Sequence, residues 1–507
     1  MDSIDIFDTA IFRDVFEPTD IFLLLEDIFG KGFKQKRIEA EQKAHVQYRF
    51  PNINDIYKYL PAYDYHKEIN MEMCHVYANP KILNMYKQNP SNYVFISDMY
   101  LPSNVLVKML EKCGYENPKV FVSCEEKCNK GSGILFDKVQ KKIGKITKHY
   151  GDNYSSDVLG CIKHNIKPVF TQALHKQIMN LPATKNPYLK KYCAVLNSSE
   201  ESALTKLAKW YAPLIYEFTK WVINKRKPGQ TIYFLSRDMF MPYLLAKTCL
   251  KQDDIKYLHC SRKSLAPLYL QSKEPELYNK MKIIFPEPEI QRIKKQGTDQ
   301  CMQYLRQSGI KNGDIIVDIG YSGSTQKVIE DSLNIKLKGL YIQLDKVPKY
   351  KTPMDMEMYL NRFVLQYRFL AEFILTSPED CIVGYKMGKP LIEQDHERRK
   401  TYAKRINSVL VDPRLFNRIN RMNLSVFDVE QTLIHIQNNL TYEMMELFNE
   451  PILCNRQKTE RGINFDKEAI LNGQLLECYR KSYAKPLFKK MLLMDPDLCS
   501  LIKLLPD

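Results

Sequence analysis

Residues 1–9 read Met-Asp-Ser-Ile-Asp-Ile-Phe-Asp-Thr, and they predict a short apolar strand that ends at Asp5. A carboxylate held rigidly at a strand end is well placed to attack phosphorus, because a fixed nucleophile loses little entropy in the reaction. Such an attack also needs a divalent cation that shields the carboxylate from the negatively charged phosphate. If Asp5 is this nucleophile, the rest of the chain must supply further acidic ligands and a positively charged side chain.

Later segments supply these groups in order. Residues 93–98 form a β-rich run that reaches Ser97, and Lys130 lies in the loop sequence Asn-Lys-Gly-Ser-Gly. We expect Ser97 to hydrogen-bond phosphoryl oxygens and Lys130 to neutralise charge. The expected ligands for Mg²⁺ are three carboxylates, those of Asp5, Asp152 and Asp157. Taken singly, Ser97 also fits a helix cap and residues 151–153 an ordinary turn, but their joint order favours phosphoryl transfer.

In these motifs the chain resembles the haloacid dehalogenase-like hydrolase superfamily over about residues 1–175. The segments Asp-Ile-Phe-Asp-Thr and Ser-Asp-Met-Tyr-Leu-Pro are similar to those of the subgroup often found with surface-polysaccharide synthesis genes. The resemblance implies a three-layer Rossmannoid domain, a Mg²⁺ cofactor and an aspartyl-phosphate intermediate. It also implies a phosphatase that acts on a sugar phosphate or a phosphorylated glycan.

One position departs from the family pattern. The usual phosphatase carries a second acid two residues after the nucleophile, and this chain has Phe7 there. Asp8 is adjacent, but on an extended strand a shift of one residue points a side chain to the other face. The alternative is therefore a catalytically silent scaffold or binding protein that keeps the fold.

Between Thr9 and Tyr93 the chain inserts about eighty residues with helical patterning, chiefly at 21–29, 33–47 and 68–86. We expect a helical cap over about residues 12–90, because such lids exclude water and complete a site. The charged residues Arg37, Glu39 and Glu41 are open to two interpretations. They either line the cap or form a solvated helix face with local ion pairs, and the second is favoured for most of them.

A chain of 507 residues is too long for one hydrophobic core. We predict a hydrolase domain at 1–178, a second α/β domain at 195–395 and a helical C-terminal region at 396–507. Residues 181–199 are expected to be a linker with a short helix, and 201–225 a long helix whose apolar residues recur at helical spacing.

The second domain repeats the alternation of strands and helices. Three predicted strands, at 231–235, 256–259 and 314–318, each end in polar residues. Ligands of parallel sheets bind at such ends, and a loop at a helix N-terminus can hold phosphate. The residues expected to bind phosphate or substrate are Ser236, Arg237, Asp238, Arg262, Asp318, Ser322, Gly323, Ser324 and Thr325.

This half resembles the phosphoribosyltransferase domains through Asp318 and the loop Gly323-Ser324-Thr325, although Ile319 replaces the family's second acid. The resemblance implies binding of phosphoribosyl pyrophosphate and a glycosyl or phosphoribosyl transfer coupled to the hydrolase in surface polysaccharide biosynthesis. The alternative is that Asp318 and Arg262 form a buried ion pair and that residues 322–325 only cap a helix.

The chain carries a net charge of +16, which favours anionic partners without saying which. Lysines are spread along the sequence and no recognised nucleic-acid-binding motif accompanies them, so nucleic acid is not favoured. Phosphorylated sugars, anionic glycan and an acidic membrane surface all fit. No signal peptide and no membrane-spanning run is recognised, and the thirteen cysteines are scattered, so we expect a cytoplasmic protein with reduced thiols.

Overall fold

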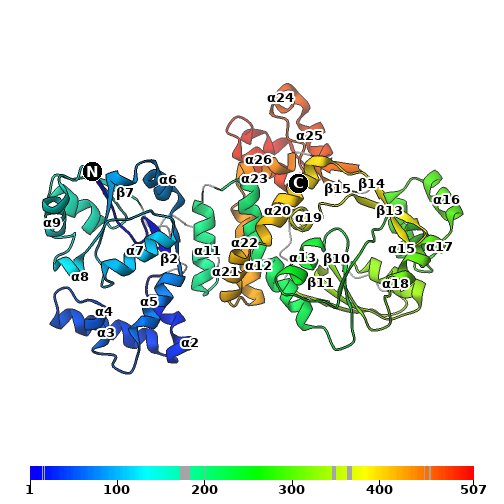
Figure 1. The fold of residues 1–507 in the computed structure, drawn as a ribbon. Helices are drawn as coiled ribbons and strands as arrows, with labels where there is room; N and C mark the ends of the chain where they lie inside the picture. The colour runs from blue at the N-terminus through cyan, green and yellow to red at the C-terminus, as the bar shows by residue number, and fades with distance from the viewer. Residues whose placement is uncertain are drawn as a thin grey trace. The chain divides into compact units, whose positions relative to one another are not determined.

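The computed structural model describes residues 1–13, 15, 17–171, 183–199, 201–344, 350–361, 368–449, 451–455, 458–482 and 484–506. The chain divides into two compact units, Met1–Glu200 and Glu201–Asp507, which we call unit 1 and unit 2. Each unit contains a five-stranded parallel sheet with helices around it (Figure 1), which confirms the predicted α/β class.

The first strand of the chain lies at the centre of the sheet of unit 1, whose order is β5-β4-β1-β6-β7. Counted along the chain this is the order 3-2-1-4-5, which reverses between β1 and β6. In open parallel sheets such a reversal leaves a crevice at the carboxyl ends of the strands, where ligands bind. The strands are β1 (Asp2–Ile4), β4 (Tyr93–Ser97), β5 (Val120–Val122), β6 (Lys148–Gly151) and β7 (Lys167–Phe170).

Both faces of this sheet are buried. Phe95 of β4 packs in one hydrophobic core, whereas its neighbours Val94 and Ile96 pack in another. Because side chains alternate between the faces of a strand, both faces must be covered. The helices that follow the strands are α7 (Ser103–Lys112), α8 (Ser123–Glu126), α9 (Ile134–Ile143) and α10 (Gly160–Ile162), with a π-helical turn, η2 (Tyr154–Leu159).

The segment predicted to be a linker forms α11 (Pro187–Ser198), which belongs to unit 1. Its Ala194 is fully buried and packs with Phe12, and its Lys191 is also buried. This helix is therefore part of the packed unit.

The cap is a helical insertion framed by a two-stranded antiparallel ribbon, β2 (Ile11–Arg13) and β3 (Val76–Ala78). The predicted helix at 33–47 is confirmed as α3. The single helical stretch expected at 68–86 is wrong, because β3 interrupts it to pair with β2. The helices are α1 (Asp20–Leu24), α2 (Glu26–Phe29), α3 (Phe33–Gln47), α4 (Ile53–Tyr57), α5 (Tyr65–Cys74) and α6 (Pro80–Gln88), with a short turn, η1 (Pro90–Asn92).

Arg37 of α3 does not lie on a solvated face. Its side chain is fully buried, with two hydrogen bonds of 2.7 and 2.9 Å to Glu68 of α5 and one of 2.8 Å to Glu41. Its guanidinium also lies 4.5 Å from the ring centre of Phe22. Arg37 therefore ties the cap helices together, whereas Glu39 is exposed as expected. The charge pattern of α3 alone could not show that another helix covers this position.

The sheet of unit 2 has the order β12-β11-β10-β8-β9. Counted along the chain from its other edge this is 2-1-3-4-5, which reverses between β8 and β10. The three predicted strands are confirmed as β8, β9 and β10. The bounds are β8 (Ile232–Leu235), β9 (Ile255–Leu258), β10 (Ile315–Tyr321), β11 (Lys338–Leu344) and β12 (Asp355–Met358).

Helices connect and surround these strands. The predicted long helix is confirmed as α12, and its apolar stripe is buried. The elements up to residue 393 are α12 (Ala203–Asn224), α13 (Phe240–Thr248), α14 (Ala266–Gln271), α15 (Pro275–Ile284), α16 (Glu287–Gln296), α17 (Asp299–Gln307), α18 (Ser324–Leu333), α19 (Arg368–Leu375) and a hairpin of β13 (Cys381–Lys386) and β14 (Lys389–Glu393).

The C-terminal region is mainly helical, and it belongs to the same compact unit as the second sheet. Its helices α20 and α22 pack against α12 (Figure 1). None of the described helices has both the length and the apolar composition needed to cross a membrane. The elements are α20 (Glu397–Leu410), α21 (Pro413–Arg421), α22 (Val426–Asn438), α23 (Tyr442–Glu446), η4 (Leu447–Asn449), β15 (Pro451–Asn455), β16 (Lys458–Arg461), α24 (Lys467–Ala469), η5 (Ile470–Gln474), α25 (Leu475–Lys481), α26 (Lys485–Met494) and η6 (Cys499–Leu504).

Candidate functional site

A cavity of about 350 Å³ lies at the carboxyl ends of the strands of unit 1, where the strand order reverses. All five residues that the sequence singles out in this unit line it: Asp5, Ser97, Lys130, Asp152 and Asp157. Asp5 directly follows β1, and its backbone N–H donates to the Tyr150 carbonyl of β6 at 2.8 Å. The fold therefore brings together groups that are spread over more than 150 residues of sequence.

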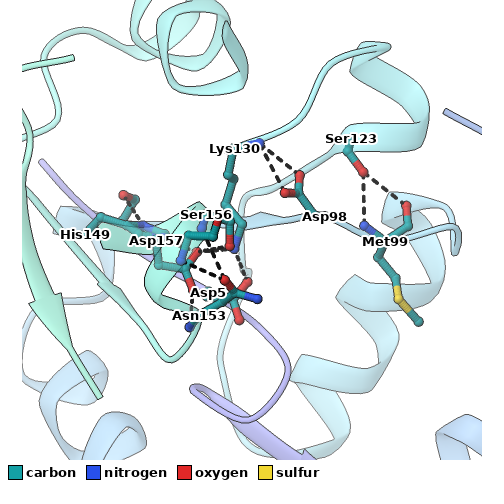
Figure 2. A network of polar contacts seen from close by, with 11 residues as sticks. Asp5, Asp98, Met99, Ser123, Lys130, His149, Asn153, Ser156 and Asp157 are labelled. Atoms are coloured by element: carbon teal, nitrogen blue, oxygen red, sulfur yellow. Dashed lines mark hydrogen bonds and ion pairs between the residues drawn. The ribbon is translucent and has the colours of Figure 1, made fainter. Parts of the chain in front are cut away.

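Lys130 links two of the carboxylates. Its Nζ lies 2.5 Å from Asp5 Oδ1 and 2.6 Å from Asp157 Oδ1, and all three side chains are buried (Figure 2). The backbone N–H of Lys130 donates to both oxygens of Asp98, at 3.0 and 3.1 Å. Asp98 thus fixes the loop that carries the lysine, while the lysine itself faces the carboxylates.

Asp157 is positioned by the turn that precedes it. Its Oδ2 accepts from the Asn153 backbone N–H at 2.9 Å, and its own N–H donates to the Asn153 carbonyl at 2.8 Å. Gly151 leaves the necessary space, because a Cβ there would lie 2.4 Å from the Asp157 side chain. This close approach explains the glycine in the Gly151-Asp152-Asn153 turn.

His149 of β6 supports Asp157 from within the sheet. Its Nε2 lies 3.2 Å from Asp157 Oδ1 and its Nδ1 lies 2.8 Å from Ser3 Oγ. Burial lowers the pKa of His149, so the imidazole is neutral and Nε2–H can donate to the carboxylate while Nδ1 accepts from the serine. His149 is therefore a buried partner of Asp157, with no exposed surface.

The site holds more negative than positive charge. Burial, together with Asp157 and Asp152, raises the pKa of Asp5 despite the neighbouring lysine. Burial, then Asp8 and Asp157, raise the pKa of Asp152 to about 6. Burial disfavours the charged form of Lys130, but Asp5 and Asp157 outweigh it and raise the pKa of this lysine. One lysine thus faces three carboxylates that repel one another.

These carboxylates fit a metal ion. One oxygen from each of Asp5, Asp152 and Asp157 lies within 4.8 Å of the others. Carboxylate oxygens are the ligands that hard divalent cations such as Mg²⁺ prefer, and such a cation would balance the excess negative charge. The geometry shows that the three residues can hold a metal, without identifying it.

The first loop also brings Asp8 to the cavity. β1 ends at Ile4, so the alternation of an extended strand does not govern Asp8, which has a φ of +57° in the following turn. Asp8 lines the cavity beside Asp5, and Lys191 Nζ lies 3.3 Å from its Oδ1. Phe7 lines the cavity as well, with the guanidinium of Arg13 3.7 Å from its ring centre. The loop therefore presents two acids to the cavity.

The cap supplies the outer wall. Phe22, Glu41 and Glu72 of the cap helices line the cavity opposite the strand ends. Arg13 forms two hydrogen bonds with Glu72, at 2.9 and 3.2 Å, and both side chains are buried. An aromatic ring beside carboxylates offers contacts to the apolar face and the hydroxyl groups of a sugar.

Sequence reasoning did not indicate the contacts of two supporting residues, Asp98 and His149. Asp98 follows Ser97 directly, but only the fold shows that it accepts from a backbone group 32 residues later. Side chains alternate between the two faces of a strand, so His149 and Gly151 lie on the same face of β6. This pattern could have placed His149 beside the site.

In unit 2 the structure gathers most of the predicted residues around a second cavity, of about 520 Å³, at the ends of β8, β9 and β10. Of the nine predicted residues, seven line it: Ser236, Arg237, Asp238, Arg262, Asp318, Ser324 and Thr325. Ser322 and Gly323 do not. Ser322 instead accepts a hydrogen bond from Lys280 of α15, a lining residue that the sequence did not indicate.

Several of these residues have local roles that limit their part in binding. Ser236 Oγ donates to the Cys260 carbonyl at 2.6 Å and accepts from its N–H at 3.0 Å, which ties the ends of β8 and β9 together. Gly320 lies within β10, and a Cβ there would come within 1.7 Å of the Gln343 carbonyl. Gly320 thus serves the close packing of β10 on β11.

The alternative of a buried ion pair between Asp318 and Arg262 does not match the geometry. Within the described parts of unit 2 the two side chains form no ion pair, and Arg262 is exposed. The N-cap of α18 is Gly323, which has no side chain to cap the helix. Asp318 and Arg262 therefore both line the cavity without an ion pair to each other.

Comparison with known protein families finds no family model that matches this chain, and comparison with curated proteins finds no relative. The residues of the two cavities and the chemistry that they permit are therefore the basis for a function.

Proposed function

We propose that unit 1 is a Mg²⁺-dependent phosphohydrolase of the haloacid dehalogenase-like type, which cleaves the phosphate monoester of a sugar or glycan through an aspartyl-phosphate. The observation that carries this proposal is the buried Lys130 between Asp5 and Asp157 on an open cavity. Burying one lysine among three carboxylates leaves net negative charge in a low dielectric. A metal ion and a phosphate group would complete this charge arrangement, whereas a scaffold has no need for it.

In the first half-reaction an Asp5 carboxylate oxygen attacks phosphorus. The bond between phosphorus and the sugar oxygen breaks, and its electron pair leaves on that oxygen, which takes a proton from water. Lys130 and the Ser97 hydroxyl stabilise the charge on the phosphoryl oxygens. When bound, the divalent cation held by Asp5, Asp152 and Asp157 would screen the nucleophile from the phosphate.

In the second half-reaction water attacks the aspartyl-phosphate. The bond between phosphorus and Asp5 breaks, inorganic phosphate leaves, and Asp8 takes the proton of the attacking water. Lys191 Nζ lies 3.3 Å from Asp8 Oδ1 and holds this carboxylate at the cavity wall, where it can accept a proton from the attacking water. Because Phe7 gives the leaving oxygen no acid, esters of more acidic alcohols should react faster.

The test is release of inorganic phosphate from a panel of sugar phosphates and 4-nitrophenyl phosphate, with Mg²⁺ and with a chelator. We expect metal-dependent release, fastest for the most acidic leaving group. Asp5→Asn should abolish it, whereas Asp137→Asn, on the exposed side of α9, should not. Asp8→Asn should slow release by about 10²-fold and let the phosphorylated protein accumulate, detected by mass spectrometry.

Two outcomes would overturn the proposal. If no substrate gives release above Asp5→Asn, unit 1 is the silent scaffold. If release persists in Asp5→Asn, the nucleophile is wrong. The coupled phosphoribosyl or glycosyl transfer in polysaccharide synthesis, suggested by the sequence of unit 2, stays a prediction that this assay does not address.

A further inference from the structure

The cavity of unit 2 lies where the strand order of its own sheet reverses, between β8 and β10. Its walls are the loops that follow β8, β9 and β10, together with α15 and α19. It is larger than the cavity of unit 1, and each of its lining residues belongs to unit 2. It therefore shares no lining residue with the cavity of unit 1.

Two cations on this cavity have no carboxylate partner. In the described part of the chain neither Lys280 nor Arg262 forms an ion pair, and the polar partner of Lys280 Nζ is the Ser322 hydroxyl. Burial, and then the charge of Arg262, lower the pKa of Lys280 to about 8. The charges of Glu276 and Asp318 offset this lowering only in part, so an anion beside Lys280 and Arg262 would still be favourable.

The start of α18 adds polar groups beside them. This helix of ten residues begins at Ser324, and Ser324 and Thr325 both line the cavity. Their hydroxyls lie 3.3 and 3.2 Å from the Tyr269 hydroxyl, so the first turn is held in place. A helix N-terminus favours negative charge, and here it lies on the same cavity as the two cations.

Carboxyl groups lie at the same cavity. Burial, and then the charge of Asp238, raise the pKa of both Asp318 and Glu372 to about 7. Asp318 Oδ1 accepts from the Ile319 N–H at 2.8 Å, and Glu372 accepts from the Tyr321 hydroxyl. Their remaining oxygens can bind hydroxyl groups, which donate to a carboxylate and accept from a carboxylic acid.

We propose that unit 2 holds a second ligand site, which binds a sugar phosphate with its phosphate at Lys280, Arg262 and the start of α18 and its hydroxyl groups at Asp318 and Glu372. The site goes beyond the hydrolase proposed for unit 1, because it uses other residues on another sheet. A ligand with an anionic end and a hydroxyl-bearing end matches the two kinds of group on the cavity wall.

The test is calorimetric titration of the full-length Asp5→Asn protein with ribose 5-phosphate and with glucose 1-phosphate, in a chelator that removes divalent metal. We expect at least one of the two to bind. Lys280→Gln should weaken that binding at least tenfold. Lys282→Gln, an exposed position on the same helix, should not change it. Arg262→Gln, at an exposed position, gives a second variant that should fold normally.

Further titrations separate the two ends of the ligand. Asp318→Asn should weaken binding of the sugar phosphate while leaving that of inorganic phosphate unchanged, and the parent sugar should bind weakly. Absence of binding by both sugar phosphates, or unchanged affinity in both Lys280→Gln and Arg262→Gln, would overturn the site. Equal affinity for inorganic phosphate and sugar phosphate would overturn the role of the carboxyl groups. Phosphate release by native unit 1 is measured separately, so the two proposals fail independently.

Discussion

Both units place a lysine at the reversal point of a parallel sheet, but the two lysines have opposite surroundings. In unit 1, Lys130 lies 2.5 and 2.6 Å from two carboxylates and its pKa is raised. In unit 2, Lys280 has a serine hydroxyl as its polar partner and its pKa is lowered to about 8. The same strand-end geometry can therefore hold a lysine that is paired with carboxylates or one that forms no ion pair, depending on which helices and loops surround it.

The largest expected effect comes from removing the paired lysine. Lys130→Met leaves Asp5 and Asp157 buried without their cation, so we expect unit 1 to lose about 3–5 kcal/mol of stability in the absence of metal. Hydrogen–deuterium exchange of peptides that contain β1 and β6 would measure this loss. Lys142→Met is the matched control, since its ion pair with Glu126 is exposed on the lysine side and is worth about 1 kcal/mol or less. Equal changes in the two variants would contradict the charge balance described for the site.

Divalent metal should then act on one unit alone. At about one hundred times the dissociation constant, Mg²⁺ should stabilise unit 1 by about 2.7 kcal/mol, and Asp152→Asn should remove most of this gain. Exchange of the β1 and β6 peptides reports on unit 1. Trp210 and Trp221, the two tryptophans of the chain, both lie on α12 and report on unit 2 by fluorescence. A metal-dependent shift in the fluorescence transition would place a metal in the wrong unit.

The contrast between the units also shows what the sequence could reveal. Asp5, Lys130 and Asp157 were predictable, because each lies just beyond a strand or in a turn and their types suit one reaction. Lys280 and Glu372 lie on helices, and no local pattern shows which helical face opens onto a cavity. For the same reason the charge pattern of α3 favoured a solvated face, although Arg37 is fully buried and bonded to Glu68 of α5. Roles that depend on a neighbour from a distant segment became visible only in the fold.

A smaller effect concerns the carboxyl groups of unit 2. The pKa of Asp318 is about 7 in the folded protein, above its ordinary 3.8, so the folded state holds a proton more tightly between these values. Its contribution to stability is present below pH 4 and is lost as the pH rises through 7. The urea midpoint from tryptophan fluorescence should fall between pH 5 and 8, by the equivalent of about 1 kcal/mol. Asp318→Asn should weaken this dependence, leaving the part that comes from Glu372, whereas exposed Asp253→Asn should not change it. An unchanged slope in Asp318→Asn would show that this carboxyl group is already ionised.

The smallest effect is the most direct contrast with Lys130. Lys280 has a pKa of about 8 in the folded protein against an ordinary 10.5, so it destabilises the fold below pH 8 and ceases to do so above about 10.5. In buffer free of phosphate, Lys280→Met should therefore raise the urea midpoint slightly at pH 7, by about 1 kcal/mol or less, and lose this advantage near pH 10.5. In saturating sugar phosphate the native protein should instead be more stable than Lys280→Met at pH 7, because only the native protein has the lysine that binds the phosphate. If Lys280→Met instead destabilises unit 2 as strongly as Lys130→Met destabilises unit 1, then Lys280 has an anionic partner of its own and the two lysines do not differ in how their charge is balanced.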